Sequence, residues 1–183
     1  MGIKNNCPPE TIVTERLRLR IPQRSDADAI FQGYAQDPEV VRYLAWRPHQ
    51  SIEETRRFVE ERIAEWNTGS RFSWSITRKE DQHLIGMLSI RRPVPFRISM
   101  SYVICKGEWG KGYGTETART ILDWALSLPE VFRVEACCDL ENVGSARVLE
   151  KLGMNREGIL RRTGYTPNIS DQPRDCFCYA KVK

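Results

Sequence analysis

The chain has 183 residues and a net charge of +4, with 40% hydrophobic and 28% charged residues. This composition excludes a disordered chain and fits one domain, residues 1–183, that can bury a sizeable core. No dense Lys/Arg run, no apolar run near the ~18 residues of a membrane span and no signal-peptide stretch is present. We therefore expect a cytoplasmic protein with no nucleic-acid or membrane partner, and a flexible N-terminus over residues 1–11.

The first half of the chain predicts a strand, three helices and a hairpin. Leu17, Leu19 and Ile21 alternate with arginines, as in a half-buried strand. A first helix begins near residue 25, a second at Asp37-Pro38, and a third behind a capping box at residues 51–54. Two apolar runs, over residues 72–76 and 84–90, are separated by a polar turn and predict a hairpin.

The second half predicts alternating strands and helices. Strands are expected over residues 98–104 and 134–139, and helices over 115–128 and from Asn142 to Gly153. Two closing strands follow, over residues 159–165 and 175–182. The pattern indicates a mixed α/β domain with a mostly antiparallel sheet of about 6–7 strands and flanking helices.

The most informative stretch is the glycine-rich loop over residues 109–116, Trp-Gly-Lys-Gly-Tyr-Gly-Thr-Glu. It follows a strand and precedes a helix, so its free N–H groups point toward one spot where a helix dipole favours an anion. The spacing is neither that of a P-loop nor that of the dinucleotide fingerprint. The loop therefore indicates a pyrophosphate cradle to which Lys111 can add a cation. A tight strand–helix turn without a ligand is the alternative.

Three segments in order resemble the GCN5-related N-acetyltransferase (GNAT) superfamily, in its ribosomal-protein N-terminal acetyltransferase (RimJ/RimL-like) branch. They are Thr-Glu-Arg-Leu-Arg-Leu-Arg at 14–20, the loop at 109–114, and Glu-Asn-Val-Gly-Ser-Ala-Arg-Val-Leu-Glu-Lys-Leu-Gly-Met at 141–154. The loop is similar to the family's [QR]-x-x-G-x-[GA] phosphate motif. The resemblance spans about residues 12–181 and is specific because the segments occur together and in the family's order.

The resemblance implies a GNAT-like fold whose central strands, 98–104 and 134–139, splay apart. The cosubstrate would be acetyl-CoA, with no metal, and the reaction would be acetyl transfer to a primary amine by direct attack on the thioester. The pantetheine arm would pair with the splayed strands, and the acetyl carbonyl would lie near residues 100–103. The cofactor-binding residues implied are Tyr102, Val103, Trp109, Gly110, Lys111, Gly112, Tyr113, Gly114, Thr115, Asn142 and Ser145.

The proton-transfer groups depart from the family pattern. Many members have a tyrosine acid in the last helix, and the matching residue here is Leu149. The resemblance then implies Ser145 as the catalytic residue that hydrogen-bonds the thiolate or relays a proton. Its alternative role is a residue suited to a helix N-terminus. The position of a frequent glutamate base is Ser99, which leaves Asp139 or Glu141 as candidate bases, or surface acids.

The acceptor is expected to be the N-terminal α-amine of a protein. At pH 7 roughly a tenth of an α-amine is neutral, against about one lysine in a few thousand, so a site with a weak base favours the α-amine. The loop over residues 42–49 is basic, aromatic and bounded by proline, as expected of a recognition loop or of a plain surface loop. A small amine acceptor, a non-catalytic acetyl-CoA-binding module and a homodimer remain open.

Overall fold

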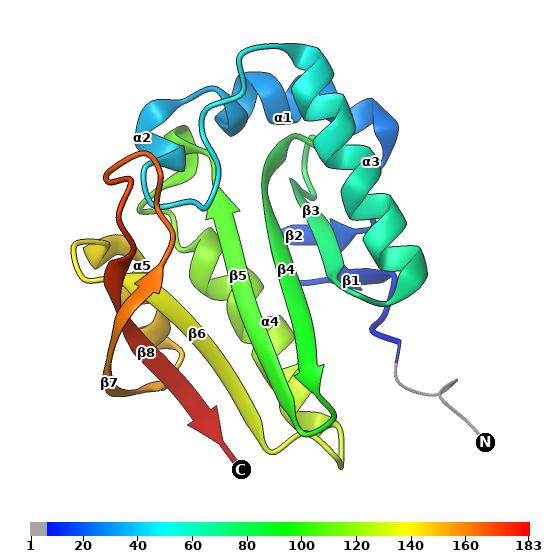
Figure 1. Ribbon diagram of the computed structural model, residues 1–183. Helices are drawn as coiled ribbons and strands as arrows, with labels where there is room; N and C mark the ends of the chain where they lie inside the picture. Colours follow the sequence, from blue (N-terminus) through cyan, green and yellow to red (C-terminus); the bar gives the residue numbers. More distant parts are fainter. Residues whose placement is uncertain (1–6) are drawn as a thin grey trace.

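The computed structural model describes residues 7–183 as an eight-stranded sheet with helices on both faces (Figure 1). The strand order is β1-β2-β3-β4-β5-β6-β8-β7. The strands are β1 Thr11–Val13, β2 Leu17–Arg20, β3 Phe72–Arg78, β4 Leu84–Val94, β5 Arg97–Ile104, β6 Arg133–Asp139, β7 Asn155–Gly164 and β8 Arg174–Val182. The helices are α1 Ala27–Ile30, α2 Pro38–Val41, α3 Ile52–Thr68, α4 Tyr113–Ser127 and α5 Val143–Lys151.

The sheet confirms the predicted fold class and exceeds the expected 6–7 strands by β1. All neighbouring strands pair antiparallel except β5 and β6. The additional strand has three residues, too few for an alternating pattern to appear in the sequence. The first predicted helix is broken: a 3-10 turn at Arg24–Asp26 leads into α1, and a π turn at Phe31–Ala35 follows it.

Local chemistry sets the helix starts. The Asp37 carboxylate accepts from the backbone N–H groups of Glu39 and Val40 at the start of α2. The Ser51 hydroxyl accepts from the Glu54 N–H at the start of α3. These side chains satisfy N–H groups that have no carbonyl partner within the helix.

Two apolar clusters hold the layers together. The larger packs α4 and α5 on one face of the sheet and includes Leu17, Trp74, Ile121 and Leu149. The smaller joins α1 and α3 to β4 on the other face, through residues such as Ile30, Val59 and Met87. Because both faces are covered, the sheet edges and the gaps between strands are where a ligand can reach the backbone.

The parallel pair β5–β6 is such a gap. Its register contains only Arg97↔Arg133, Ile98↔Val134 and Ser99↔Glu135, although β5 continues to Ile104 and β6 to Asp139. The two strands diverge beyond Ser99, as Figure 1 shows. This is the splayed pair that the family resemblance predicted.

We expected residues 1–11 to be flexible, and residues 1–6 of this stretch lie outside the described residues. In the part that is described, Pro8 is buried and the Pro9 carbonyl accepts a hydrogen bond from the Trp74 indole at 3.0 Å.

Candidate functional site

The glycine-rich loop follows the end of β5, beyond the point where β5 and β6 stop pairing. Gly110 and Gly112 have φ of 76° and 83°, a left-handed conformation that glycine adopts without the clash of a Cβ. Gly112 is the N-cap of α4 and supplies no side-chain bond to the helix, whereas α3 and α5 are capped by Ser51 and Asn142. The first N–H groups of α4 are therefore available to an anion.

An arginine from the link between β1 and β2 also reaches this loop. The Arg16 guanidinium donates to the Lys111 carbonyl at 3.0 Å and lies 4.6 Å from the centre of the Tyr113 ring. Glu116 of α4 fixes it, because its carboxylate accepts from Arg16 Nε at 2.7 Å and from the Thr14 hydroxyl at 2.6 Å. Burial raises the pKa of Glu116, but these hydrogen bonds outweigh it and hold the pKa below the usual value. The segment at residues 14–20 supported the family resemblance, but the sequence predicted no role for Arg16.

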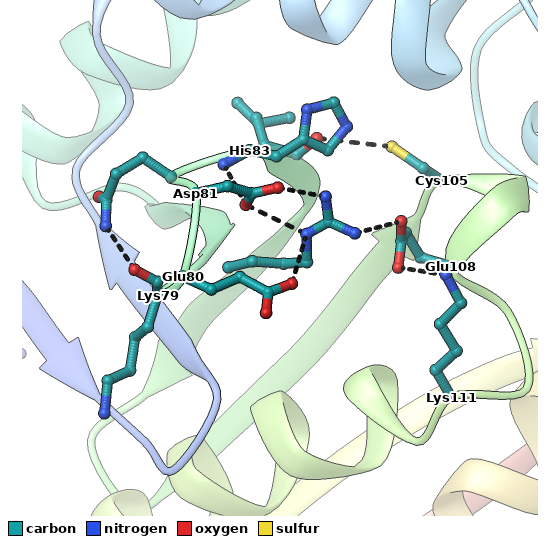
Figure 2. Close-up of polar contacts among 10 residues, drawn as sticks. Lys79, Glu80, Asp81, His83, Cys105, Glu108 and Lys111 are labelled. Atoms are coloured by element: carbon teal, nitrogen blue, oxygen red, sulfur yellow. Dashed lines mark hydrogen bonds and ion pairs between the residues drawn. The ribbon is translucent and has the colours of Figure 1, made fainter.

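Lys111 has a carboxylate partner. Glu108 is buried and accepts from Lys111 Nζ at 3.0 Å and from Arg78 Nη1 at 3.1 Å. Arg78 also binds Asp81 in the turn between β3 and β4, so one chain of charges links that turn to the loop (Figure 2). Trp109 is tied to the sheet, since its indole donates to the Ile104 carbonyl at 2.7 Å. These contacts fix the loop from two sides.

Two hydroxyl groups meet between β5 and α5. Tyr102 Oη lies 3.1 Å from Ser145 Oγ. Burial is the main cause that raises the pKa of Tyr102 to about 12, so the phenol keeps its proton at neutral pH. Asn142 is the N-cap of α5, where its side-chain oxygen accepts from the Ser145 N–H at 3.1 Å. The sequence predicted Asn142 and Ser145 at this place, but it did not pair Ser145 with the Tyr102 phenol.

The other acid and base candidates have different surroundings. Leu149 is fully buried in the larger apolar cluster. Asp139 is buried and its carboxylate accepts from Arg174 Nε at 2.6 Å and Nη2 at 3.1 Å. Burial raises the pKa of Asp139, but the hydrogen bonds from Arg174 and the Glu141 N–H, with the charges of Arg174 and Arg42, together outweigh it and lower the pKa. Glu141 pairs with the same arginine at 3.0 Å. Asp139 is therefore a weak proton acceptor, and Glu141 is engaged by the same arginine.

A pocket of about 500 Å³ opens on the α1–α3 side of β5. Its floor includes Ser101, Tyr102 and Val103 of β5. Its walls come from the predicted recognition loop and from α3, and include Leu44, Ala45, Trp46, His49, Glu54, Arg57, Phe58, Glu61 and Arg62. The pocket thus reaches the segment of β5 that faces the splayed gap.

The loop over residues 42–49 is held by contacts with the C-terminal part of the chain. The Asn168 amide, between β7 and β8, donates to the carbonyls of Val41 and Trp46, both at 2.7 Å. The Tyr43 hydroxyl donates to the Glu141 carbonyl at 3.2 Å. Trp46 packs on the smaller apolar cluster and also lines the pocket, so the two roles considered for it are compatible.

Residues 7–183 show neither a cluster of metal ligands nor a membrane-spanning helix. No group of three or more His, Cys, Asp or Glu side chains there could hold a metal ion. The cysteines are all free thiols in this part of the chain, and four of them are buried: Cys105, Cys138, Cys176 and Cys178. Within the same residues, no helix has the length and apolar character needed to cross a membrane.

Comparison with known proteins decides the family. The acetyltransferase (GNAT) domain model matches residues 16–155. The chain belongs to the GNAT family. A curated relative, the uncharacterized N-acetyltransferase p20 of Bacillus licheniformis, is 30% identical over 154 residues, covering 83% of this chain and 86% of p20.

Solved GNAT structures share the fold. RimL, a ribosomal-protein alpha-N-acetyltransferase solved with coenzyme A, matches with a TM-score of 0.81 at 21% identity, over 93% of this chain and 96% of RimL. The microcin self-immunity acetyltransferase MccE, solved with acetyl-CoA and AMP, matches with a TM-score of 0.85 at 18% identity, over 98% of this chain and 100% of MccE.

As a GNAT enzyme, the protein is an N-acetyltransferase that uses acetyl-CoA. The GNAT resemblance read from three sequence segments is confirmed. The acceptor amine is not fixed by these similarities.

Proposed function

We propose that the protein transfers the acetyl group of acetyl-CoA to the N-terminal α-amine of a protein. The observation that carries the proposal is the continuity of two features at β5. One edge of this strand borders the gap that opens beyond Ser99, and residues 101–103 also form the floor of the acceptor-side pocket. An acyl group held along β5 would therefore be reached by an amine from the pocket.

The cosubstrate would be bound by backbone and side-chain groups on one side of the gap. The N–H groups over residues 110–115 would hold the pyrophosphate, where the uncapped start of α4 favours negative charge. Gly110 has open space around its Cα: an added Cβ would meet nothing within 4 Å. The unpaired edges of β5 and β6 would accept the extended pantetheine arm as an additional strand.

The acyl transfer needs polar groups at three places. As the amine nitrogen attacks the carbonyl carbon, a C–N bond forms and the C–S bond breaks, and a backbone N–H near residues 100–103 would stabilise the oxyanion. The Ser145 hydroxyl would donate to the departing thiolate. The Tyr102 phenol, 3.1 Å from Ser145 Oγ, can donate to Ser145 in turn because its pKa of about 12 keeps it protonated.

The α-amine is favoured because the candidate carboxylates near the gap are engaged by an arginine. Asp139 and Glu141 are both paired with Arg174, and the family's glutamate position is Ser99 at the closed end of the gap. An amine that is already partly neutral at pH 7 suits such a site better than a lysine side chain. RimL, a structural neighbour, is described as an alpha-N-protein acetyltransferase.

The test is an acetyl-CoA turnover assay that detects free thiol. It compares peptides that begin with Ser, Ala or Met, the same peptides with blocked N-termini, and a polyamine panel. Turnover that needs a free N-terminus is the expected result. Turnover with polyamines alone would replace the protein acceptor with a small amine, and binding of acetyl-CoA without any turnover would leave a non-catalytic module.

The hydroxyl pair is tested in the same assay. We expect Ser145→Ala to lower kcat by about 10²-fold with KM nearly unchanged, because it removes a group that acts on the leaving thiolate. Tyr102→Phe should lower kcat by a smaller factor in the same direction, since it acts through Ser145. Both variants should still bind CoA, which calorimetry can measure. A parent-like kcat in Ser145→Ala would contradict the assigned role.

A further inference from the structure

Among residues 7–183, His49 is the one histidine that lines the pocket beside β5. It has no role in the proposed transfer as described above. His49 ends the loop over residues 42–49 and lies beside Trp46 and Phe58, with ring centroids 4.8 and 5.7 Å away. Its backbone N–H donates to the Ala35 carbonyl at 2.9 Å. The two aromatic contacts hold the ring, and the backbone hydrogen bond fixes the main chain of His49 at the pocket wall.

One ring nitrogen of His49 has a partner and the other has none. His49 Nδ1 lies 2.7 Å from the hydroxyl oxygen of Thr55, a fully buried residue in the first turn of α3. Within residues 7–183, no hydrogen bond reaches His49 Nε2, and Nε2 is not among the buried polar atoms without partners. Nε2 therefore keeps solvent-accessible surface, and His49 is one of the residues that line the pocket.

We propose that His49 is the proton acceptor for the acceptor amine, with Nε2 as the accepting atom and Thr55 as the residue that fixes the tautomer. The inference rests on the proposed transfer to an amine. In this arrangement Nδ1–H donates to the Thr55 oxygen, which leaves the Nε2 lone pair free. The 2.7 Å distance between Nδ1 and the Thr55 oxygen fits either direction of the hydrogen bond, and the proposal assigns the ring as the donor.

The proton balance is complete with the groups already described. His49 Nε2 takes one proton from the entering ammonium, which makes the nitrogen nucleophilic. A second proton leaves the nitrogen as the C–N bond forms, and one proton is gained by the thiolate as the C–S bond breaks. The imidazolium then returns its proton to solvent. The net reaction is ammonium plus thioester to amide, thiol and one released proton.

The surroundings of His49 suit a base at neutral pH. Burial is the main cause that lowers the pKa of His49 from its usual 6.5, with the Glu54 carboxylate opposing it and the Arg57 guanidinium reinforcing it. An uncharged imidazole is thus the resting form at pH 7, and it can accept a proton.

The neighbouring carboxylates are engaged elsewhere. Glu54 accepts from the Gln50 N–H at 2.9 Å, and Glu61 pairs with Arg62 at 3.2 Å. Arg71 also lines the pocket and pairs with Glu65 at 3.7 Å. Imidazole is therefore the pocket group whose basicity is best matched to an α-amine with a pKa near 8.

The kinetic test compares kcat against pH, at saturating Ala-initiated peptide, for the parent, His49→Gln and Thr55→Val. Without a base the reaction needs the neutral amine, so kcat of His49→Gln should fall below about pH 8. The parent should hold its plateau down to about pH 6.5. At pH 7 we expect His49→Gln to lose about 10²-fold in kcat and Thr55→Val to lose less. A trifluoroethylamine acceptor, already neutral at pH 7, should largely close the gap between parent and His49→Gln.

The matched control is His83→Gln, which changes the other histidine of the chain, an exposed residue outside the pocket. It should keep parent kinetics, and it leaves His49 as the single imidazole for NMR. Its ¹⁵N shifts should report a neutral ring with the proton on Nδ1 at pH 7. An Nε2–H tautomer or a charged ring at pH 7 would overturn the inference whatever the activity.

The kinetic outcomes separate the two proposals. Turnover of free-amine peptides by the parent, together with a parent-like pH profile in His49→Gln, overturns only the role of His49. An inactive parent with every peptide and amine removes the proposed transfer, and the base with it. A loss of CoA binding in calorimetry identifies a His49→Gln variant that fails because it is misfolded. In that case the NMR result on His83→Gln decides.

Discussion

Replacing Gly110 with alanine tests the assignment of the glycine-rich loop. Gly110 has φ of 76°, and an added Cβ would meet no atom within 4 Å, so the substitution adds backbone strain without a clash. A left-handed conformation costs an L-residue about 1–2 kcal/mol. If the loop keeps its shape, thermal unfolding should show a Tm lower by about 2–8 °C, from about 2–4 °C per kcal/mol at this chain length.

The strain can instead be relieved if the loop changes φ and turns its N–H groups away. Stability is then largely kept and acetyl-CoA binding weakens, by about 5- to 30-fold for the same 1–2 kcal/mol. Thermal unfolding measures the loss of stability, and calorimetry on the same preparation measures the loss of acetyl-CoA binding free energy. The two losses together should equal the strain energy of about 1–2 kcal/mol.

Gly107→Ala is the matched control, three residues earlier in the same connection. Its added Cβ also meets nothing within 4 Å, and its φ is not positive. It should therefore match or slightly exceed the parent in Tm and bind acetyl-CoA as the parent does. If Gly110→Ala behaves like Gly107→Ala in both measurements, the loop does not need its left-handed residue, and the cradle assignment fails.

Two further substitutions test local stability. Asn142→Ala removes the oxygen that accepts from the Ser145 N–H, so thermal unfolding should show a loss of about 1 kcal/mol, while Asn142→Asp stays near the parent; equal stability of all three would contradict the cap. Asp26→Asn breaks a buried pair with Arg20 at 2.6 Å and should cost about 3 kcal/mol. Burial raises the pKa of Asp26, but the hydrogen bonds from Arg20, the Gln23 N–H and Ser75, with the charge of Arg20, together outweigh it and lower the pKa. This contribution is therefore complete above the unfolded-state pKa near 3.9 and is lost as pH falls through the lower folded value. Acid unfolding between pH 5 and 2 should be less steep in Asp26→Asn than in the parent.

Local patterns predicted most of the fold. The alternation over residues 98–104 and the apolar face over 115–128 are properties of a few consecutive residues, and β5 and α4 lie there. The splayed pair depends on how far two strands stay in register, which no local pattern encodes, and only the family resemblance supplied it. β1 was missed because its partner β2, rather than its own three residues, defines it.

The candidate site was predicted where its residues adjoin in sequence and missed where they meet from a distance. Glu116 contacts Arg16 across 100 residues, and Tyr102 meets Ser145 across 43. His49 and Thr55 are six apart, but the hydrogen bond requires the loop to turn back on α3. Such contacts follow from packing, so the sequence offered the residue types without their pairing.

The three-pair register between β5 and β6 makes the stability of the protein depend on its cosubstrate. Beyond Ser99 and Glu135 the two strands present backbone groups that neither satisfies for the other, and exposed strand edges of this kind also invite pairing with other chains. A cosubstrate that fills the gap therefore stabilises the fold by mass action, by about 2.7 kcal/mol when present at 100 times its Kd. When acetyl-CoA is scarce, the enzyme would lose both its substrate and part of its resistance to unfolding, so its abundance would follow the supply of activated acetate.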